Sequence, residues 1–131
     1  MEHIVDHLGL NVTDYARSKI FYQAALAPLG IQLVMEFGRA GGFGRGPKPE
    51  FWIGAGKTAF QTEEQIKTIT PIHVCFSART REEVDAFHGA ALAAGAQDNG
   101  PPGLRAHYHP NYYGAFVLDP DGHNIEAVFH G

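Results

Sequence analysis

A near-repeat of one seven-residue segment is the feature that most constrains this chain. FYQAALA occupies residues 21–27, and FHGAALA occupies residues 87–93, which is 66 positions later. The same offset carries His7, in VDHLGLNV, onto His73, in PIHVCFSA. An offset shared by a helix-like segment and a histidine indicates an internal duplication. Each half of a 131-residue chain is too short to bury a sufficient core alone, so the two halves must share one domain, residues 1–131.

The first half has the pattern of a strand, a helix and three short strands. In residues 4–12, IVDHLGLNV, apolar positions alternate with His7, Gly9 and Asn11, which is typical of a strand with one buried face. A helix follows, before Pro28, and then glycine-interrupted apolar segments. The apolar stripe expected on this helix consists of Ile20, Phe21, Ala24, Ala25 and Leu26.

The second half repeats this order. Residues 71–77 alternate as a strand, and Thr80 with Glu83 predicts a capping box before the second helix. The turn DPDG, at residues 119–122, separates two strand-like segments and favours a hairpin. We therefore predict an α+β fold in which two βαβββ modules, about residues 1–60 and 70–131, form a cup-shaped mixed sheet.

Composition argues against several classes of function. The net charge is −4 and the 10 basic residues are scattered, so no nucleic-acid partner is expected. The single cysteine, Cys75, cannot form an intrachain disulfide, and the first residues, MEHIVDH, lack the pattern of a signal peptide. We expect a cytoplasmic protein. No apolar run approaches the roughly 18 residues of a membrane helix, so no membrane partner is expected.

Three side chains of the predicted sheet could bind a metal ion. Glu126, in NIEAVFH, shares a strand face with Asn124 and Val128, and that face is expected to be the one that carries His7 and His73. Two imidazoles and one carboxylate from three strands form a ligand set that leaves coordination positions open for a substrate. The alternative is a set of hydrogen-bonded polar residues on a half-exposed sheet. The repeat symmetry favours the metal site, with Zn, Ni, Mn or Fe as the divalent ion.

The segment PPGLRAHYHPNYYGAF, before the last hairpin, concentrates histidine, tyrosine and arginine. Among these residues, His107, His109 or Tyr113 is expected to act as a general acid or base beside the metal, and Arg105 to hold an anionic group of the substrate. The alternative is an aromatic loop that packs over the sheet or against a second subunit. Three other histidines, His3, His123 and His130, are expected near strand ends.

Three segments of the chain resemble the vicinal oxygen chelate superfamily, and the resemblance covers nearly the whole length. They are DHLGLNVTDYARSKIFYQAALAPLGI, IHVCFSA and FVLDPDGHNIEAV, of which the last is the most specific. This superfamily includes glyoxalase I, fosfomycin-resistance thiol transferases, extradiol dioxygenases and bleomycin-resistance proteins, and the chain is most similar to uncharacterised glyoxalase-like single-domain members. The resemblance implies paired βαβββ modules that form a cup, with His7, His73 and Glu126 at positions of metal ligands.

The chain also departs from the better-known members. Glyoxalase I has a fourth ligand, a glutamate, in the strand that reads EFWIGAG here, and Glu50 at the edge of this strand is the nearest acid. The loop before the last hairpin also differs from that of the fosfomycin transferases.

Arg45 and Lys48, in a turn, are weaker candidates for anion contacts. Cys75 is expected to be a small buried thiol rather than a nucleophile.

These features predict a glyoxalase-like enzyme that uses a divalent metal as a Lewis acid on a small, oxygen-chelating substrate, in a lyase or isomerase reaction. One alternative is ring cleavage by Fe(II), as in extradiol dioxygenases. Another is a protein of the bleomycin-resistance type that binds a small molecule without catalysis. A homodimer is the default assembly, and the sequence does not decide whether the cup closes within one chain or across two.

Overall fold

The structure is a computed structural model that describes residues 4–131. In module 1 the elements are β1 (Leu8–Asn11), α1 (Tyr15–Leu26), a short 3-10 helix η1 (Ala27–Leu29), β2 (Gln32–Phe37), β3 (Ala40–Gly44) and β4 (Phe51–Gly54). A short helix, α2 (Glu63–Lys67), lies in the connection between the modules. In module 2 they are β5 (His73–Ser77), α3 (Arg81–Ala93), β6 (Gln97–Leu104), β7 (Tyr113–Leu118) and β8 (Asn124–Phe129).

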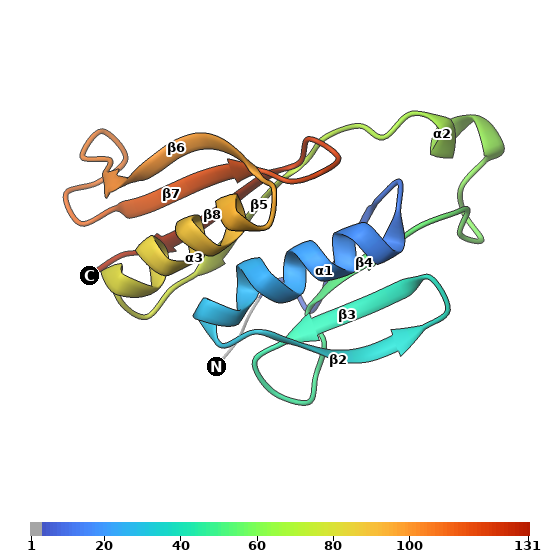
Figure 1. The fold of residues 1–131 in the computed structure, drawn as a ribbon, viewed down its shortest axis with the longest axis horizontal. Coiled ribbons are helices and arrows are strands. Elements are labelled where there is room, and N and C mark those ends of the chain that lie inside the picture. The colour runs from blue at the N-terminus through green and yellow to red at the C-terminus, as the bar shows by residue number, and fades with distance from the viewer. Residues whose placement is uncertain (1–3) are drawn as a thin grey trace.

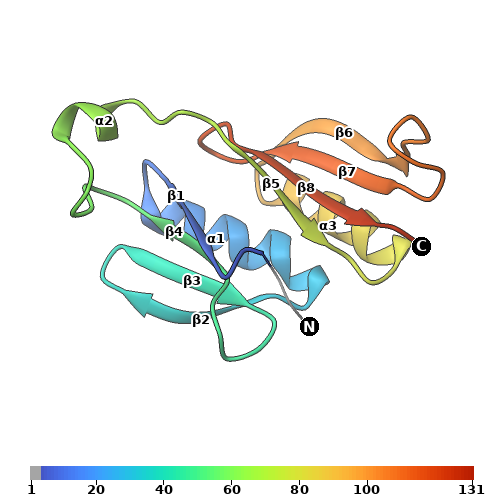
Figure 2. The same ribbon diagram turned by 180° about the vertical axis from the view of Figure 1, so that it is seen from behind.

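The strands form two four-stranded mixed sheets of the same topology. Their orders are β1-β4-β3-β2 and β5-β8-β7-β6, and in each sheet the first pair is parallel and the other pairs are antiparallel. Helices α1 and α3 cover one side of the two sheets (Figure 1), and the strands are seen uncovered from the other side (Figure 2). We call this second side the open face of each module. The predicted α+β fold of two βαβββ modules is confirmed.

The apolar core lies between the two helices and the two sheets. Phe21 and Tyr22 of α1 and Val84 and Phe87 of α3 are almost fully buried. The predicted stripe on α1 was partly wrong, because Ile20 is 68% exposed, Ala24 is exposed as well, and Tyr22 takes the inward position. Tyr22 can be buried because its hydroxyl donates a hydrogen bond to Asp119 of module 2 at 2.5 Å, which satisfies its polar end.

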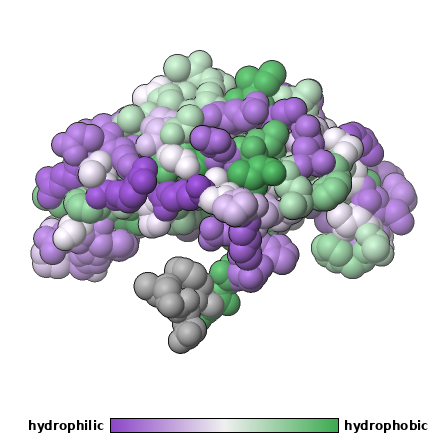
Figure 3. Space-filling view, turned by 90° about the horizontal axis from the view of Figure 1, so that it is seen from below, coloured by the Kyte–Doolittle hydropathy of each residue, from purple (hydrophilic) through white to green (hydrophobic). Residues whose placement is uncertain are grey.

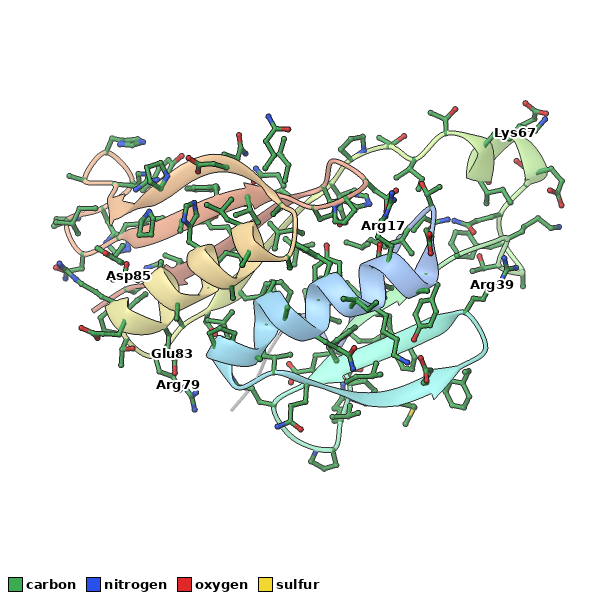
Figure 4. The ribbon with its side chains drawn as sticks, in the orientation of Figure 1. Arg17, Arg39, Lys67, Arg79, Glu83 and Asp85 are labelled. Atoms are coloured by element: carbon green, nitrogen blue, oxygen red, sulfur yellow. The ribbon has the colours of Figure 1, made fainter. Side chains whose placement is uncertain are left out.

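Helix α3 begins at the expected capping residue, Thr80, but the expected capping box is incomplete. Thr80 caps α3 by accepting a hydrogen bond from the backbone N–H of Glu83 at 3.0 Å. The Glu83 carboxylate, however, accepts hydrogen bonds from the backbone N–H and the guanidinium of Arg79, at 2.8 and 2.9 Å. Arg79 and Glu83 lie together at the start of α3 in Figure 4, so the capping box is only half formed.

The turn between β7 and β8 holds the two modules together, and we call residues 119–123 the module joint. Asp119 accepts hydrogen bonds from Tyr22 of α1 and from the backbone N–H groups of Asp121 and His123. Asp121 accepts hydrogen bonds from the backbone and side chain of Thr13, at the end of module 1 that carries Arg17 in Figure 4.

The imidazole of His123 completes the module joint. Its Nδ1 accepts the backbone N–H of Ile72, and its Nε2 donates to the carbonyl of Asn11 at the end of β1, so both ring nitrogens are used. His123 therefore ties the end of β1 to the residue before β5 at the junction between the modules.

Seen from below in Figure 3, the surface is a mixture of hydrophilic and hydrophobic residues. Within residues 4–131, no helix combines the length and the hydropathy that crossing a membrane requires.

Candidate functional site

The open face of module 2 carries a buried carboxylate beside an imidazole. Glu126 is 1% exposed, although it points to the open face and away from the helices. Its neighbours across the sheet are Cys75 of β5 and Phe116 of β7. Glu126 Oε1 lies 3.2 Å from Nε2 of His73, so the two polar groups approach each other directly.

The hydrogen bonds of His73 determine which of its nitrogens carries a proton. Its Nδ1 lies 2.9 Å from the carbonyl oxygen of Asn124, and a carbonyl oxygen only accepts, so Nδ1 must be the donor. In the neutral ring, Nε2 then has a lone pair that faces the Glu126 carboxylate. Two acceptors facing each other repel, so a proton or a metal cation must lie between them. A carbonyl that orients the far nitrogen is the usual arrangement around a metal-bound histidine.

Tyr112 is the second partner of the carboxylate. Its hydroxyl donates a hydrogen bond to Glu126 Oε2, and burial, followed by this bond and the nearby negative charge, raises the pKa of Tyr112 above the usual range of tyrosine. Gly114 leaves the room for this contact, because a Cβ at that position would lie 3.0 Å from Glu126 Oε2 and 3.1 Å from the tyrosine ring. The neutral phenol is therefore a proton donor held at the carboxylate.

Cys75 faces the same carboxylate and is not prepared as a nucleophile, but the expectation of a buried side chain was wrong, because Cys75 lies exposed on the open face. Desolvation and the neighbouring Glu126 charge raise the pKa of the Cys75 thiol above its ordinary value. The thiol therefore stays protonated at neutral pH, and a protonated thiol is a poor nucleophile and a poor metal ligand.

His7 lies apart from this group. It precedes β1, its side chain is 59% exposed, and its Nδ1 is 2.7 Å from Asp6 Oδ1. Over residues 4–131, no three side chains of histidine, cysteine, aspartate or glutamate are arranged so that they could hold a metal ion together. The structure thus brings two of the three expected ligands, His73 and Glu126, into contact, and it places His7 at the neighbouring edge strand.

The adjacent residues Tyr112 and Tyr113 face opposite sides of the sheet. Tyr113 begins β7, donates a hydrogen bond to Asp85 of α3 at 2.7 Å and lies under the guanidinium of Arg81. It therefore points to the helix-covered side of the sheet, and the adjacent Tyr112 is the tyrosine beside the carboxylate. The sequence contained both residues, but only the pairing of β7 with β8 shows which one faces Glu126.

The other candidate residues of this loop differ in their exposure and in their distance from Glu126. Arg105 follows the end of β6, where its guanidinium donates hydrogen bonds to two backbone carbonyls and lies 5.5 Å above the Phe116 ring. That ring in turn stacks on His73, at 6.2 Å between centroids. His109 packs against Tyr112 and forms a 2.6 Å hydrogen bond with His130, whereas His107 is exposed and packs only on Tyr108.

The weaker candidates have other partners. Arg45 donates hydrogen bonds to the carbonyls of Leu29 and Ser77 and so links the two modules. Lys48 pairs with Asp6 at 2.9 Å. Glu50 is exposed just before β4, and its backbone carbonyl accepts the N–H of Leu8. His3 lies outside the described residues.

The duplication assigns a counterpart to Glu126 in module 1. Gly9 and Cys75 are 66 positions apart, the same offset that relates the two histidines. In the sheets, Cys75 is paired with Glu126, and Gly9 is paired with Trp52. Module 1 therefore has an indole at the position where module 2 has its carboxylate.

A family profile matches nearly the whole chain. The family profile described as "Glyoxalase/Bleomycin resistance protein/Dioxygenase superfamily" matches residues 4–127. A search of curated proteins finds no match.

Solved structures of similar fold cover almost the whole chain. A glyoxalase/bleomycin resistance protein from Albidiferax ferrireducens T118 is 29% identical, with a TM-score of 0.77 over 98% of this chain and 100% of that one. A putative glyoxalase from Bacillus halodurans is 24% identical, with a TM-score of 0.69 over 98% and 96% of the two chains. Lactoylglutathione lyase from Agrobacterium tumefaciens is 19% identical, with a TM-score of 0.67 over 98% and 94%.

Proposed function

Since this chain belongs to the glyoxalase/bleomycin resistance protein/dioxygenase superfamily, we propose that it is a metal-dependent enzyme that acts on a small molecule. The proposed substrate chelates a divalent ion through two neighbouring oxygens, and the proposed reaction is of the lyase or isomerase type. The family membership supports a small-molecule site in general, and the open face of module 2 supports this more specific proposal.

The observation that carries the proposal is the approach of His73 to Glu126. With its proton on Nδ1, the imidazole of His73 directs Nε2 at a carboxylate oxygen 3.2 Å away, and either a second proton or a metal cation can lie between these two atoms. His73 and Glu126 would hold a divalent cation at this point, because an imidazole with a carboxylate is a ligand pair common to Zn, Ni, Mn and Fe sites. His7 is the proposed third ligand, and its ring would have to turn away from Asp6.

When bound, the metal supplies Lewis-acid stabilisation of negative charge on the substrate oxygens. Side chains of the protein are proposed to transfer protons and to bind the substrate. Tyr112 holds a proton at Glu126 Oε2 and is the proposed general acid, in the role first assigned to Tyr113. Arg105, stacked over Phe116, is proposed to hold an anionic group of the substrate. His109, packed on Tyr112, and His107, at the loop tip, are proposed to exchange protons with solvent.

A second candidate function is binding without catalysis. The feature that favours it is the position of His7, because an ion held only by His73 and Glu126 would be bound weakly. In that case the open faces would hold a small molecule through their aromatic and charged side chains. The metal-dependent enzyme requires metal binding that depends on His7, whereas a protein that only binds a small molecule does not.

The test is the metal content of the purified protein and of two variants, His7→Gln and His73→Gln. We expect near-stoichiometric divalent metal in the wild type and a loss in both variants, because each variant removes one ligand. His107→Gln is the matched control, since this histidine is exposed, and its metal content should not change. Equal metal in all four proteins, or no metal even after incubation with Zn²⁺, Ni²⁺, Mn²⁺ and Fe²⁺, would refute the proposal.

A mixing experiment shows whether the site is built from one chain. We propose that all three ligands come from the same chain, because the module joint ties β1 to module 2 of that chain. An equimolar mixture of His7→Gln and Glu126→Gln, unfolded and refolded together, should then bind no more metal than either variant alone. Recovery of metal binding in the mixture would mean that the site forms across a homodimer.

A further inference from the structure

The open face of module 1 contains a hollow beside His7. It has a volume of about 910 Å³ and lies between β1, β4, the β2–β3 hairpin and residues 57–61. This volume is within the usual range of small-molecule pockets. The side-chain amide of Gln61 donates a hydrogen bond to Asn11 of β1 at 3.0 Å, and this bond holds residues 57–61 in place as one wall.

The floor of the hollow is aromatic. Trp52 and Phe37 are stacked nearly parallel, with 6.2 Å between ring centroids and 13° between ring planes, and we call this pair the aromatic platform. Phe37 is 64% exposed, and Phe60 at the rim is 84% exposed. Gly42 lets the indole lie on the backbone of β3, because a Cβ there would lie 2.9 Å from the indole ring. Exposed aromatic faces of this kind favour stacking with another flat ring.

The charges around the platform are mainly positive. The lining includes Arg39, Lys48 and Lys57 and one carboxylate, Asp6, which pairs with Lys48 at 2.9 Å. Within the described chain, neither Arg39 nor Lys57 takes part in a salt bridge. Arg39 extends from the β2–β3 hairpin toward the segment that leads to α2 (Figure 4), and its guanidinium lies next to Gly56. Two cations are therefore available to a ligand on the platform.

We propose that this hollow binds a planar aromatic anion, whose ring stacks on the aromatic platform and whose charge lies near Arg39 and Lys57. Trp52 stands at the position that Glu126 occupies in module 2, so the duplicated modules contribute different functions: one recognises the ligand and the other binds the ion. This inference names the substrate class of the proposed enzyme and rests on the proposed function to that extent. The binding itself does not require a metal.

The experiment uses protein treated with EDTA, so that its result does not depend on the metal site. Binding of 2-naphthoate and of the neutral analogue 2-naphthamide is measured by calorimetry. Trp52 is the only tryptophan in the chain, so its NMR indole N–H signal reports occupancy of the platform directly. The variants are Trp52→Leu and the double variant Arg39→Gln with Lys57→Gln. Arg79→Gln is the matched control, because Arg79 lies at the start of α3.

We expect 2-naphthoate to bind and to shift the Trp52 signal, and Trp52→Leu to weaken binding about tenfold. The double variant should weaken 2-naphthoate about tenfold and 2-naphthamide less than about twofold, because only the anion uses the two cations. Arg79→Gln should bind like the wild type. Absence of binding at millimolar 2-naphthoate would overturn the inference, and so would equal weakening of both ligands in the double variant. If no variant affects metal content but these results hold, the proposed function fails and this inference stands.

Discussion

The open faces of the two modules have the same backbone topology and different chemistry. On module 2 the central position of the last strand is Glu126, which contacts His73 and Tyr112. On module 1 the corresponding position is Trp52, which stacks on Phe37. The duplicated strands place both side chains alike, so the difference lies in the side chains alone. One copy of the module provides charged ligand atoms, and the other provides a flat apolar surface with cations around it.

One substitution in each module should separate metal binding from binding of the aromatic anion, and this is the largest effect expected. Glu126→Gln keeps the shape of the side chain and removes the ligand charge, so metal affinity should fall about 100-fold. Its affinity for 2-naphthoate should not change. Trp52→Leu should have the opposite pattern. Calorimetric titration of both variants with Zn²⁺ and with 2-naphthoate makes the test, and a variant that loses both activities without unfolding would show that the faces do not act independently.

The module joint should stabilise the folded protein as a whole, and therefore both open faces. Asp119 is 5% exposed and accepts hydrogen bonds from the Tyr22 hydroxyl and two backbone N–H groups. Asp119→Ala leaves these buried donors without a partner, so it should lower the free energy of unfolding by about 3 kcal/mol. Urea denaturation followed by circular dichroism measures the change. Glu64→Ala, on the exposed face of α2, is the control and should have no measurable effect; an equally stable Asp119→Ala protein would contradict this role of the joint.

Two glycines allow each face to be altered alone. A Cβ at Gly42 would lie 2.9 Å from the Trp52 ring, and one at Gly114 would lie 3.0 Å from Glu126 Oε2. Each alanine should therefore cost about 1 kcal/mol of stability. Gly42→Ala should weaken 2-naphthoate several-fold and leave Zn²⁺ binding intact, whereas Gly114→Ala should weaken Zn²⁺ binding only. Thermal denaturation and the same two titrations measure these effects, and identical ligand profiles for the two variants would count against the assignment of the faces.

The smallest expected effect is the contribution of Tyr112, in module 2, to the pH dependence of stability. The pKa of Tyr112 is raised in the folded protein, so as pH rises the unfolded chain loses this proton first. Its contribution to stability is therefore complete below about pH 10 and is lost as pH rises through the folded pKa. Ultraviolet difference titration of the wild type and Tyr112→Phe isolates this tyrosine. In Glu126→Gln, which lacks the carboxylate, Tyr112 should ionise at lower pH; an unchanged titration would show that Glu126 does not hold its proton.

Much of the fold could be predicted because its signals are local or periodic. The repeat predicted two equivalent modules. The strand alternation that puts Glu126 on one face leaves Ile125 and Ala127 on the other face, and both are buried. The sequence could not show that Tyr22 is buried in place of Ile20, because the hydrogen-bond partner of the tyrosine hydroxyl lies 97 residues away. Short-range patterns carry no information about such a distant hydrogen bond.

The candidate site was less predictable for a similar reason. Tyr112 and Tyr113 are adjacent at the start of β7, and only the register with β8 decides which one faces Glu126. His7 was expected on the strand face, but β1 begins at Leu8, so its ring is free to turn to Asp6. The role of the DPDG turn as a joint also depended on contacts between the modules. The ligand set of His7, His73 and Glu126 stays a prediction.

The most direct test of the metal site is a long-range ¹H–¹⁵N NMR spectrum of the histidine rings during titration with Zn²⁺. We predict that neutral His73 carries its proton on Nδ1 before addition, and that Zn²⁺ shifts Nε2 of His73 together with the ring of His7. The rings of His109, His123 and His130 should keep their signals. If Zn²⁺ shifts His109 and His130 instead, or leaves His73 unchanged, the ion does not bind at Glu126 and the proposed metal site is wrong.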